Sequence, residues 1–215
     1  MLIIPQALSV AKFASQDTTR PALQNIKIDP DGTVWGTDGC TAVKASPIGE
    51  APDPGYFPLV PGLPAGAGAP TWPVLVPAAT ALLAMKGAAH RDNPWPFVSV
   101  VVSDETAYIC TTDGTTHNVT PVLQDGNPAE GGQYPDVLAV WPNGTIEDGA
   151  NEAGFDAGRL AALAMLAKQH TGKRDTGAMA VTLRGPGTAA SLSWLYTDGK
   201  RGVQFDAILM PKRLT

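Results

Sequence analysis

The stretch GTVWGTDGCTAV (residues 32–43) decides the fold, because its central tripeptide Thr37-Asp38-Gly39 returns as Thr112-Asp113-Gly114 and Thr197-Asp198-Gly199. Each copy lies between two strand-like runs. Asp-Gly between such runs favours a hairpin, since Gly accepts the positive φ of a tight turn. We therefore predict three hairpins. Asp38, Asp113 and Asp198 are expected to form turns, because a catalytic carboxylate cluster would require three separate turns to converge.

A helix-like segment and a further strand precede each hairpin. The expected helices cover 6–15, 78–89 and 156–170, with Asp156 as a cap, and the expected strands cover 22–28, 97–102 and 179–183. The pattern predicts an α+β fold of repeated strand-helix-strand-hairpin units. One domain would span 1–142, with units at roughly 1–60 and 73–142, and a partial domain would span 143–215. The segments 52–73 and 143–154 are interpreted as surface connections.

The composition is that of a globular protein, with 215 residues, 44% hydrophobic and 16% charged. A net charge of −5 argues against a surface coated with positive charge, but it permits a local basic strip. The N-terminal segment MLIIPQALSV has neither a basic stretch nor a long apolar run. We therefore expect no signal peptide and no membrane span, and a cytoplasmic location.

No catalytic or metal-binding motif is present. Cys40 and Cys110 lack a CxxC neighbour and are interpreted as small strand residues, and His90, His117 and His170 have no partner at metal-ligand spacing. GxSxG, P-loop and HExxH motifs are absent. His170 ends an expected helix, where a cation suits the helix dipole. The chain is predicted not to be an enzyme and to need no metal or cofactor.

Four stretches resemble the bacterial beta sliding clamp, the beta subunit of DNA polymerase III. Residues 37–43 are similar to that family's TDGHRLA segment, and 134–142 (YPDVLAVWP) to its FPDY connection between domains. Residues 91–94 (RDNP) resemble a GDNP stretch, and 208–214 (ILMPKRL) resemble the family's C-terminal VMPMRL ending. The matches occur in the same order as in the family. They imply a DNA-clamp fold, with antiparallel sheets outside and helices lining the inner face.

The chain also departs from that family. A beta clamp domain is made of two such units, so a chain with three units lacks the first domain and half of the last, as a shortened, phage-type relative would. Cys40 and Thr41 stand where the family has His and Arg, which puts partner specificity in doubt. An odd number of units means that one domain is completed across a subunit interface or that a half-domain stands alone.

The resemblance implies a DNA replication processivity factor that encircles duplex DNA as a homo-oligomer. Its partners would be DNA of any sequence, a polymerase, other proteins with clamp-binding motifs and a clamp loader. The hydrophobic peptide-binding pocket would comprise Leu8, Thr37, Gly39, Pro135, Val140, Ile208, Leu209, Met210, Pro211 and Arg213. The DNA-facing residues would be Lys12, Lys86, Arg91, Arg159, Lys168, Lys173 and Arg174.

Two alternatives remain open at this point. The first is a clamp-fold protein that binds clamp-interacting peptides without encircling DNA. The second is a β-rich structural or capsid-type protein with accidental Thr-Asp-Gly turns. Oligomeric rings and salt-sensitive association with DNA would favour the processivity factor. Peptide binding by a smaller species would favour the first alternative. The absence of both ring formation and peptide binding would favour the second alternative.

Overall fold

The structure is a computed structural model that describes residues 1–90, 92–103, 106–124, 133–142, 155–170, 179–183, 189–198 and 200–211. Its strands are β1 (Leu2–Ile3), β2 (Asn25–Ile28), β3 (Val34–Thr37), β4 (Thr41–Gly49), β5 (Val74–Pro77), β6 (Val98–Ser103), β7 (Thr106–Thr112), β8 (His117–Gln124), β9 (Ala180–Thr182), β10 (Ala190–Asp198) and β11 (Arg201–Leu209). The helices are η1 (Pro5–Phe13), η2 (Pro21–Gln24), η3 (Pro54–Tyr56), α1 (Ala78–Ala88), η5 (Val137–Val140) and α2 (Ala157–His170). No described helix is long and apolar enough to cross a membrane.

The strands form one sheet in the order β1-β6-β7-β8-β5-β2-β3-β4-β11-β10-β9, and every neighbouring pair is antiparallel. The three predicted hairpins are β3–β4, β7–β8 and β10–β11. Each Thr of the repeated tripeptide pairs with the residue five positions later, so Thr37, Thr112 and Thr197 begin hairpins of the same register. The repeated tripeptide in the sequence therefore corresponds to a repeated hairpin of the same register.

The first two Asp residues form the same turn. The Oδ1 atom of Asp38 accepts hydrogen bonds from the backbone N–H groups two and three residues on, at 2.8 and 2.7 Å. Asp113 does the same at 2.9 and 2.6 Å. Gly39 and Gly114 have φ of +87° and +90°, a region that Gly enters without a steric cost. The turn-forming role predicted for these two Asp residues is confirmed, and the side chain of Asp198 lies outside the described residues.

We define three units by these elements. The first contains β1, η1, β2, β3 and β4, the second contains β5, α1, β6, β7 and β8, and the described part of the third contains α2, β9, β10 and β11. The first two units exchange their opening strands, because β1 pairs with β6 and β5 pairs with β2. We call these two units the two-unit body. The third unit joins this body through β11, which pairs with β4 over residues 201–209.

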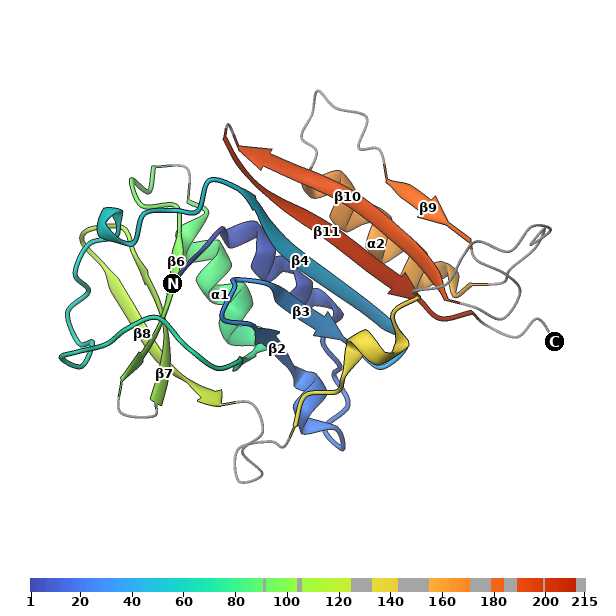
Figure 1. The fold of residues 1–215 in the computed structure, drawn as a ribbon, viewed down its shortest axis with the longest axis horizontal. Helices are drawn as coiled ribbons and strands as arrows, with labels where there is room; N and C mark the ends of the chain where they lie inside the picture. The colour runs from blue at the N-terminus through green and yellow to red at the C-terminus, as the bar shows by residue number, and fades with distance from the viewer. Residues whose placement is uncertain are drawn as a thin grey trace.

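Three helices lie on one face of the sheet. Figure 1 shows η1, α1 and α2 behind the strands, with α2 behind β10 and β11. The described parts of α1 and α2 begin and end within a residue of the predicted bounds, but the first helix is a 3₁₀ helix. It is buried on nearly every side and lies so close to β3 that a Cβ on Gly36 would stand 2.2 Å from the carbonyl oxygen of Val10. Packing rather than periodicity sets the geometry of this segment.

Candidate functional site

An apolar pocket opens where the third unit meets the first. Its volume is about 210 Å³, and it is bounded by the first Thr-Asp-Gly turn, the segment 133–142 and the end of β11. We call 133–142 the connector. The lining residues are Thr37, Gly39, Cys40, Thr41, Ala42, Pro135, Asp136, Val137, Val140, Ile208 and Met210.

Backbone hydrogen bonds hold the three walls together. Ile208 pairs with Ala42 in the β4–β11 register, and the N–H of Met210 donates to the carbonyl of Cys40 at 3.1 Å. In the connector, the Asp136 carboxylate accepts from the first two N–H groups beyond Val137, at 3.1 and 3.3 Å, and so caps η5. The pocket is therefore built on regular structure from segments that are far apart in the chain.

The pocket offers an apolar floor with an apolar rim. Ile208 and Val137 are 2% and 7% exposed, whereas Val140 and Met210 are 56% and 43% exposed at the mouth. Exposed apolar side chains around a small hollow suit the docking of one or two apolar anchor residues of a partner. Met210 adds a flexible, polarizable side chain that can adapt to different anchors.

Aromatic side chains fix the connector to the outer face of the sheet, opposite the helices (Figure 1). Trp141 packs edge-on against Trp35 of β3, with ring centroids 5.8 Å apart. Lys44 of β4 lies over both rings, at 5.4 Å from Trp141 and 5.9 Å from Trp35, and forms an ion pair with Asp206 of β11 at 3.2 Å. The pocket wall from the connector is thereby held in place by the same strands that form the floor.

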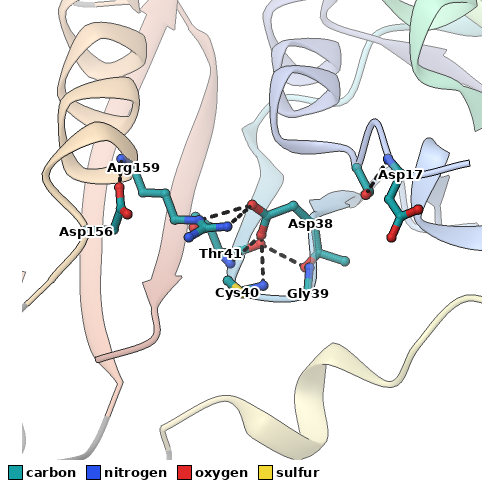
Figure 2. A network of polar contacts seen from close by, with 9 residues as sticks. Asp17, Asp38, Gly39, Cys40, Thr41, Asp156 and Arg159 are labelled. Carbon is teal, nitrogen blue, oxygen red and sulfur yellow. Dashed lines mark hydrogen bonds and ion pairs between the residues drawn. The ribbon is translucent and has the colours of Figure 1, made fainter. Parts of the chain in front are cut away.

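One ion pair ties α2 to the first Thr-Asp-Gly turn (Figure 2). The Nε and Nη2 atoms of Arg159 donate to Oδ2 of Asp38 at 3.1 and 3.0 Å, while Oδ1 of Asp38 holds its own turn. The hydrogen bond to Asp38 raises the pKa of Arg159. Asp156 caps α2 as predicted, since its Oδ1 accepts from the Arg159 N–H at 3.0 Å. The Asp38 carboxylate therefore stabilises both its own turn and the contact with α2.

His170 anchors the other end of α2, but not as a cation. Burial, with a smaller contribution from Lys12, lowers the pKa of His170 to about 4, so the ring is neutral at pH 7. The ring stacks on Phe205 at 4.4 Å, and its Nδ1 accepts from Trp194 Nε1 at 3.2 Å. The remaining ring nitrogen lies 3.2 Å from the hydroxyl of Ser9 on η1. The prediction of a charged His170 at the helix end is wrong, because desolvation outweighs the helix dipole.

The structure brings together six of the ten residues predicted for the pocket, namely Thr37, Gly39, Pro135, Val140, Ile208 and Met210. Leu8 and Leu209 are 0% and 1% exposed in the core and do not line it. Successive strand residues point to opposite faces, so Leu209 turns away from the face that Ile208 occupies. Pro211 is partly buried but outside the lining, and Arg213 lies outside the described residues.

The residues predicted to face DNA divide into three groups. Lys12, Lys86 and Lys168 are exposed on η1, α1 and α2, and Lys12 also donates to the side-chain oxygen of Gln169 at 2.5 Å. Arg159 is on α2 but pairs with Asp38. Arg91, Lys173 and Arg174 lie outside the described residues.

The two cysteines differ in their surroundings. Cys110 is in β7, as predicted, and burial raises the pKa of its thiol to about 11. Cys40 is exposed in the turn between β3 and β4 rather than within a strand, because β3 ends at Thr37 and β4 begins at Thr41. Within the described ranges, no three His, Cys, Asp or Glu side chains come together in a way that would hold a metal ion.

The solved structures that are similar to this chain include a bacterial beta clamp and an archaeal PCNA. An H. pylori beta clamp in complex with diflunisal aligns with 99% of this chain at 13% sequence identity, with a TM-score of 0.55. An A. fulgidus PCNA bound to the C-terminal region of FEN-1 aligns with 100% of this chain and 98% of its own, at 11% identity and a TM-score of 0.43. No family model matches the chain, and neither does any curated protein sequence.

The alignment covers 64% of the beta clamp, so this chain spans less than two thirds of that protein's length. At 13% identity the likeness concerns the fold and not the activity. The antiparallel sheet, the helices on one of its faces and the repeated hairpin units agree with the architecture that the sequence resemblance implied. This chain has the sliding-clamp fold.

Proposed function

We propose that this chain is a sliding-clamp-type processivity factor of DNA replication and not an enzyme. In this function it encircles duplex DNA as a homo-oligomer, without reading bases, and tethers a polymerase through the junction pocket. The observation that carries the proposal is the pocket itself. Three segments that resemble the beta clamp, at 37–43, 134–142 and 208–210, line one apolar hollow of about 210 Å³.

The helix face would contact the DNA. Lys12, Lys86 and Lys168 are exposed on three different helices that cover the same face of the sheet. Lysines reach phosphates as point charges and carry no base specificity, which suits a protein that slides. The connector lies on the other face of the sheet (Figure 1), and the pocket residues Ala42 and Ile208 pack in one cluster with Tyr134 and Val137 of the connector. DNA and a tethered partner would therefore not compete for the same surface.

Peptide binding without encirclement is the second candidate function. It is favoured by the sparse positive charge of the helix face, because α2 exposes Leu160 and Met165 beside Lys168 and α1 exposes Leu83 beside Lys86. Weak electrostatic attraction would leave DNA association dependent on ring closure alone. Both candidate functions use the pocket, and they differ in whether the chain encircles DNA.

The pocket is tested with a fluorescein-labelled synthetic peptide that carries adjacent Leu and Phe residues. Fluorescence anisotropy should show saturable binding, and Met210→Asp should weaken it at least about tenfold, since the change places a charge at an apolar mouth. Leu59→Asp is the matched control, because Leu59 is 97% exposed and outside the pocket lining. Equal affinities for wild type and Met210→Asp would remove the pocket assignment.

The DNA face is tested with closed circular duplex DNA at a series of salt concentrations. Lys12→Glu combined with Lys86→Glu should lower DNA association and flatten its salt dependence, while peptide affinity stays unchanged. Lys200→Glu serves as the control, because Lys200 is exposed in the β10–β11 turn. Peptide binding by wild type with no salt-dependent association with DNA would instead establish the second candidate function.

A further inference from the structure

A second hollow, of about 470 Å³, lies at the opposite end of β11 from the junction pocket. Strand β11 runs from Arg201, which lines this hollow, to Ile208, which lines the junction pocket. The other walls come from the start of η1, the segment that follows α1, η3 and β10. We call this hollow the aromatic pocket, because Tyr56, Phe97 and Tyr196 line it. Its volume is within the range of small-ligand sites.

Packing fixes most of the wall of the aromatic pocket. Phe97 is 6% exposed, and Tyr196 packs edge-on against His170, with ring centroids 5.9 Å apart. The side chain of Asn93 donates to the carbonyl of Ala88 at 3.4 Å and accepts from the Trp95 N–H at 2.9 Å, which ties the segment after α1 to the end of that helix. Tyr56, by contrast, is 68% exposed. The pocket therefore has a rigid wall and one aromatic ring that a ligand can reach.

Arg201 supplies a positive charge to this pocket. Its guanidinium lies over the Phe97 ring, 5.1 Å from the centroid, and it forms no ion pair with any described residue. The other two described arginines, Arg20 and Arg159, each pair with an aspartate, and the adjacent Lys200 pairs with a glutamate at 3.6 Å. An arginine held by an aromatic face keeps its N–H donors for a carboxylate or a phosphate.

The rest of the lining favours an anionic ligand. None of the lining residues is acidic, and His90 is the only other lining residue that can carry a positive charge. The carboxylates nearest in sequence to Tyr56 and His90 are Asp53 and Asp92, and both lie outside the lining. Asp53 instead caps η3, because its Oδ1 accepts from the Gly55 N–H at 2.8 Å. A cation without a carboxylate partner, beside aromatic rings, suits an anion that also has a flat apolar part.

We propose that the aromatic pocket binds one nucleotide of an unpaired DNA strand, with the base stacked on Tyr56 and the phosphate bound by Arg201. Aromatic side chains stack on any base and arginine binds the backbone, which is the combination that holds single strands without regard to sequence. Lys86, which faces DNA in the proposed function, is in the last turn of the helix whose end leads into this pocket. Neither ring closure nor the junction pocket is needed for this site.

The test uses the full chain and a fluorescein-labelled oligothymidylate of about 12 nucleotides, with fluorescence anisotropy at about 50 mM salt. Wild type should bind it saturably, and Arg201→Gln should weaken binding at least about tenfold, through the loss of a charge-assisted hydrogen bond. Lys200→Gln is the matched control, because it removes one positive charge at the adjacent position, where the side chain is 82% exposed and outside the lining. Equal losses in the two variants would reduce the effect to net charge and overturn the proposal.

Tyr56→Ala tests the stacking of the base and should weaken binding at least about fivefold. Its control is Tyr108→Ala, since Tyr108 is partly exposed in β7 and outside the lining. Circular dichroism during thermal unfolding reports whether each variant is folded. No saturable binding by wild type, undiminished binding by Tyr56→Ala, or equally tight binding of polyglutamate would overturn the proposal. Association with closed circular duplex DNA but not with the oligothymidylate would refute this site and leave the proposed function standing.

Discussion

The two-unit body and the third unit are built from the same elements, yet only the body covers its own core. In the body the inward side chains of the second strand of each unit are buried, as Ile28 of β2 and Val100 of β6 show, whereas Val181 of β9 is 52% exposed. The difference lies in the exchange of opening strands, which the described part of the third unit lacks. A pair of units closes a core, and a single unit depends on what it docks against.

The largest expected effect separates the stabilities of these two parts. Phe205 is fully buried in the third unit, where it stacks on Trp194 at 5.2 Å. Phe205→Ala should lower the free energy of unfolding of that unit by about 3–5 kcal/mol, through lost burial and a residual cavity. Hydrogen exchange should show lost protection in β10 and α2 but retained protection in β7.

The matched variant is Ile109→Ala in β7, a residue that is 2% exposed in the two-unit body. It should destabilise the body, and the third unit with it, because the third unit docks on the body through β4, the first Thr-Asp-Gly turn and η1. Equal loss of protection throughout the chain in both variants would show that the chain unfolds as one cooperative block, and the contrast between the parts would then fail.

The next effect depends on pH and arises at His170, where α2 of the third unit packs against η1 of the body. The pKa of His170 is about 4 in the folded chain and about 6.5 when exposed, so the unfolded state binds the extra proton between these values. Stability should therefore fall as pH falls from 6.5 to 4, by roughly 3 kcal/mol in total. Urea unfolding at several pH values measures this, and His170→Gln should lack that component. An unchanged midpoint between pH 7 and 5 would contradict a buried neutral ring.

The smallest effect compares two identical turns. Asp38 and Asp113 hold their hairpins with the same hydrogen bonds, but Asp38 also binds Arg159 across the junction. Asp38→Ala should therefore cost more than Asp113→Ala, by about 0.5–1 kcal/mol for a partly exposed ion pair. A double-mutant cycle with Arg159→Ala isolates the difference in chemical unfolding. A coupling energy near zero would mean that the pair only accompanies the docking of α2.

Local signals predicted most of the secondary structure. The Thr-Asp-Gly copies located all three hairpins, because the turn is made by residues within the tripeptide and the two that follow. Apolar periodicity placed α1 and α2 to within a residue. The pocket was anticipated in part, since the resemblance pointed to segments 37–43, 134–142 and 208–214 and the fold brings their described residues together. Because successive strand residues point to opposite faces, the sequence could also have predicted that Leu209 points away from the pocket that Ile208 lines.

Long-range contacts were not predictable in the same way. Arg159 and Asp38 are 121 residues apart, and nothing in either local sequence indicates the other. The pKa of His170 depends on burial between η1, α2 and β11, which a single helix pattern does not report. The aromatic packing of the connector and the exchange of opening strands likewise follow from tertiary packing, which selects partners that no periodicity encodes.

The shared register of the three hairpins has an evolutionary consequence. Each hairpin begins at the same Thr-to-fifth-residue pairing, and the third unit joins the others through its last strand. A gene duplication that appends a block in the way the third unit is attached needs to match a single strand edge, and a deletion that removes this unit disturbs a single edge. Chain length in this architecture can therefore change by whole blocks during descent, while the blocks that remain keep their internal contacts.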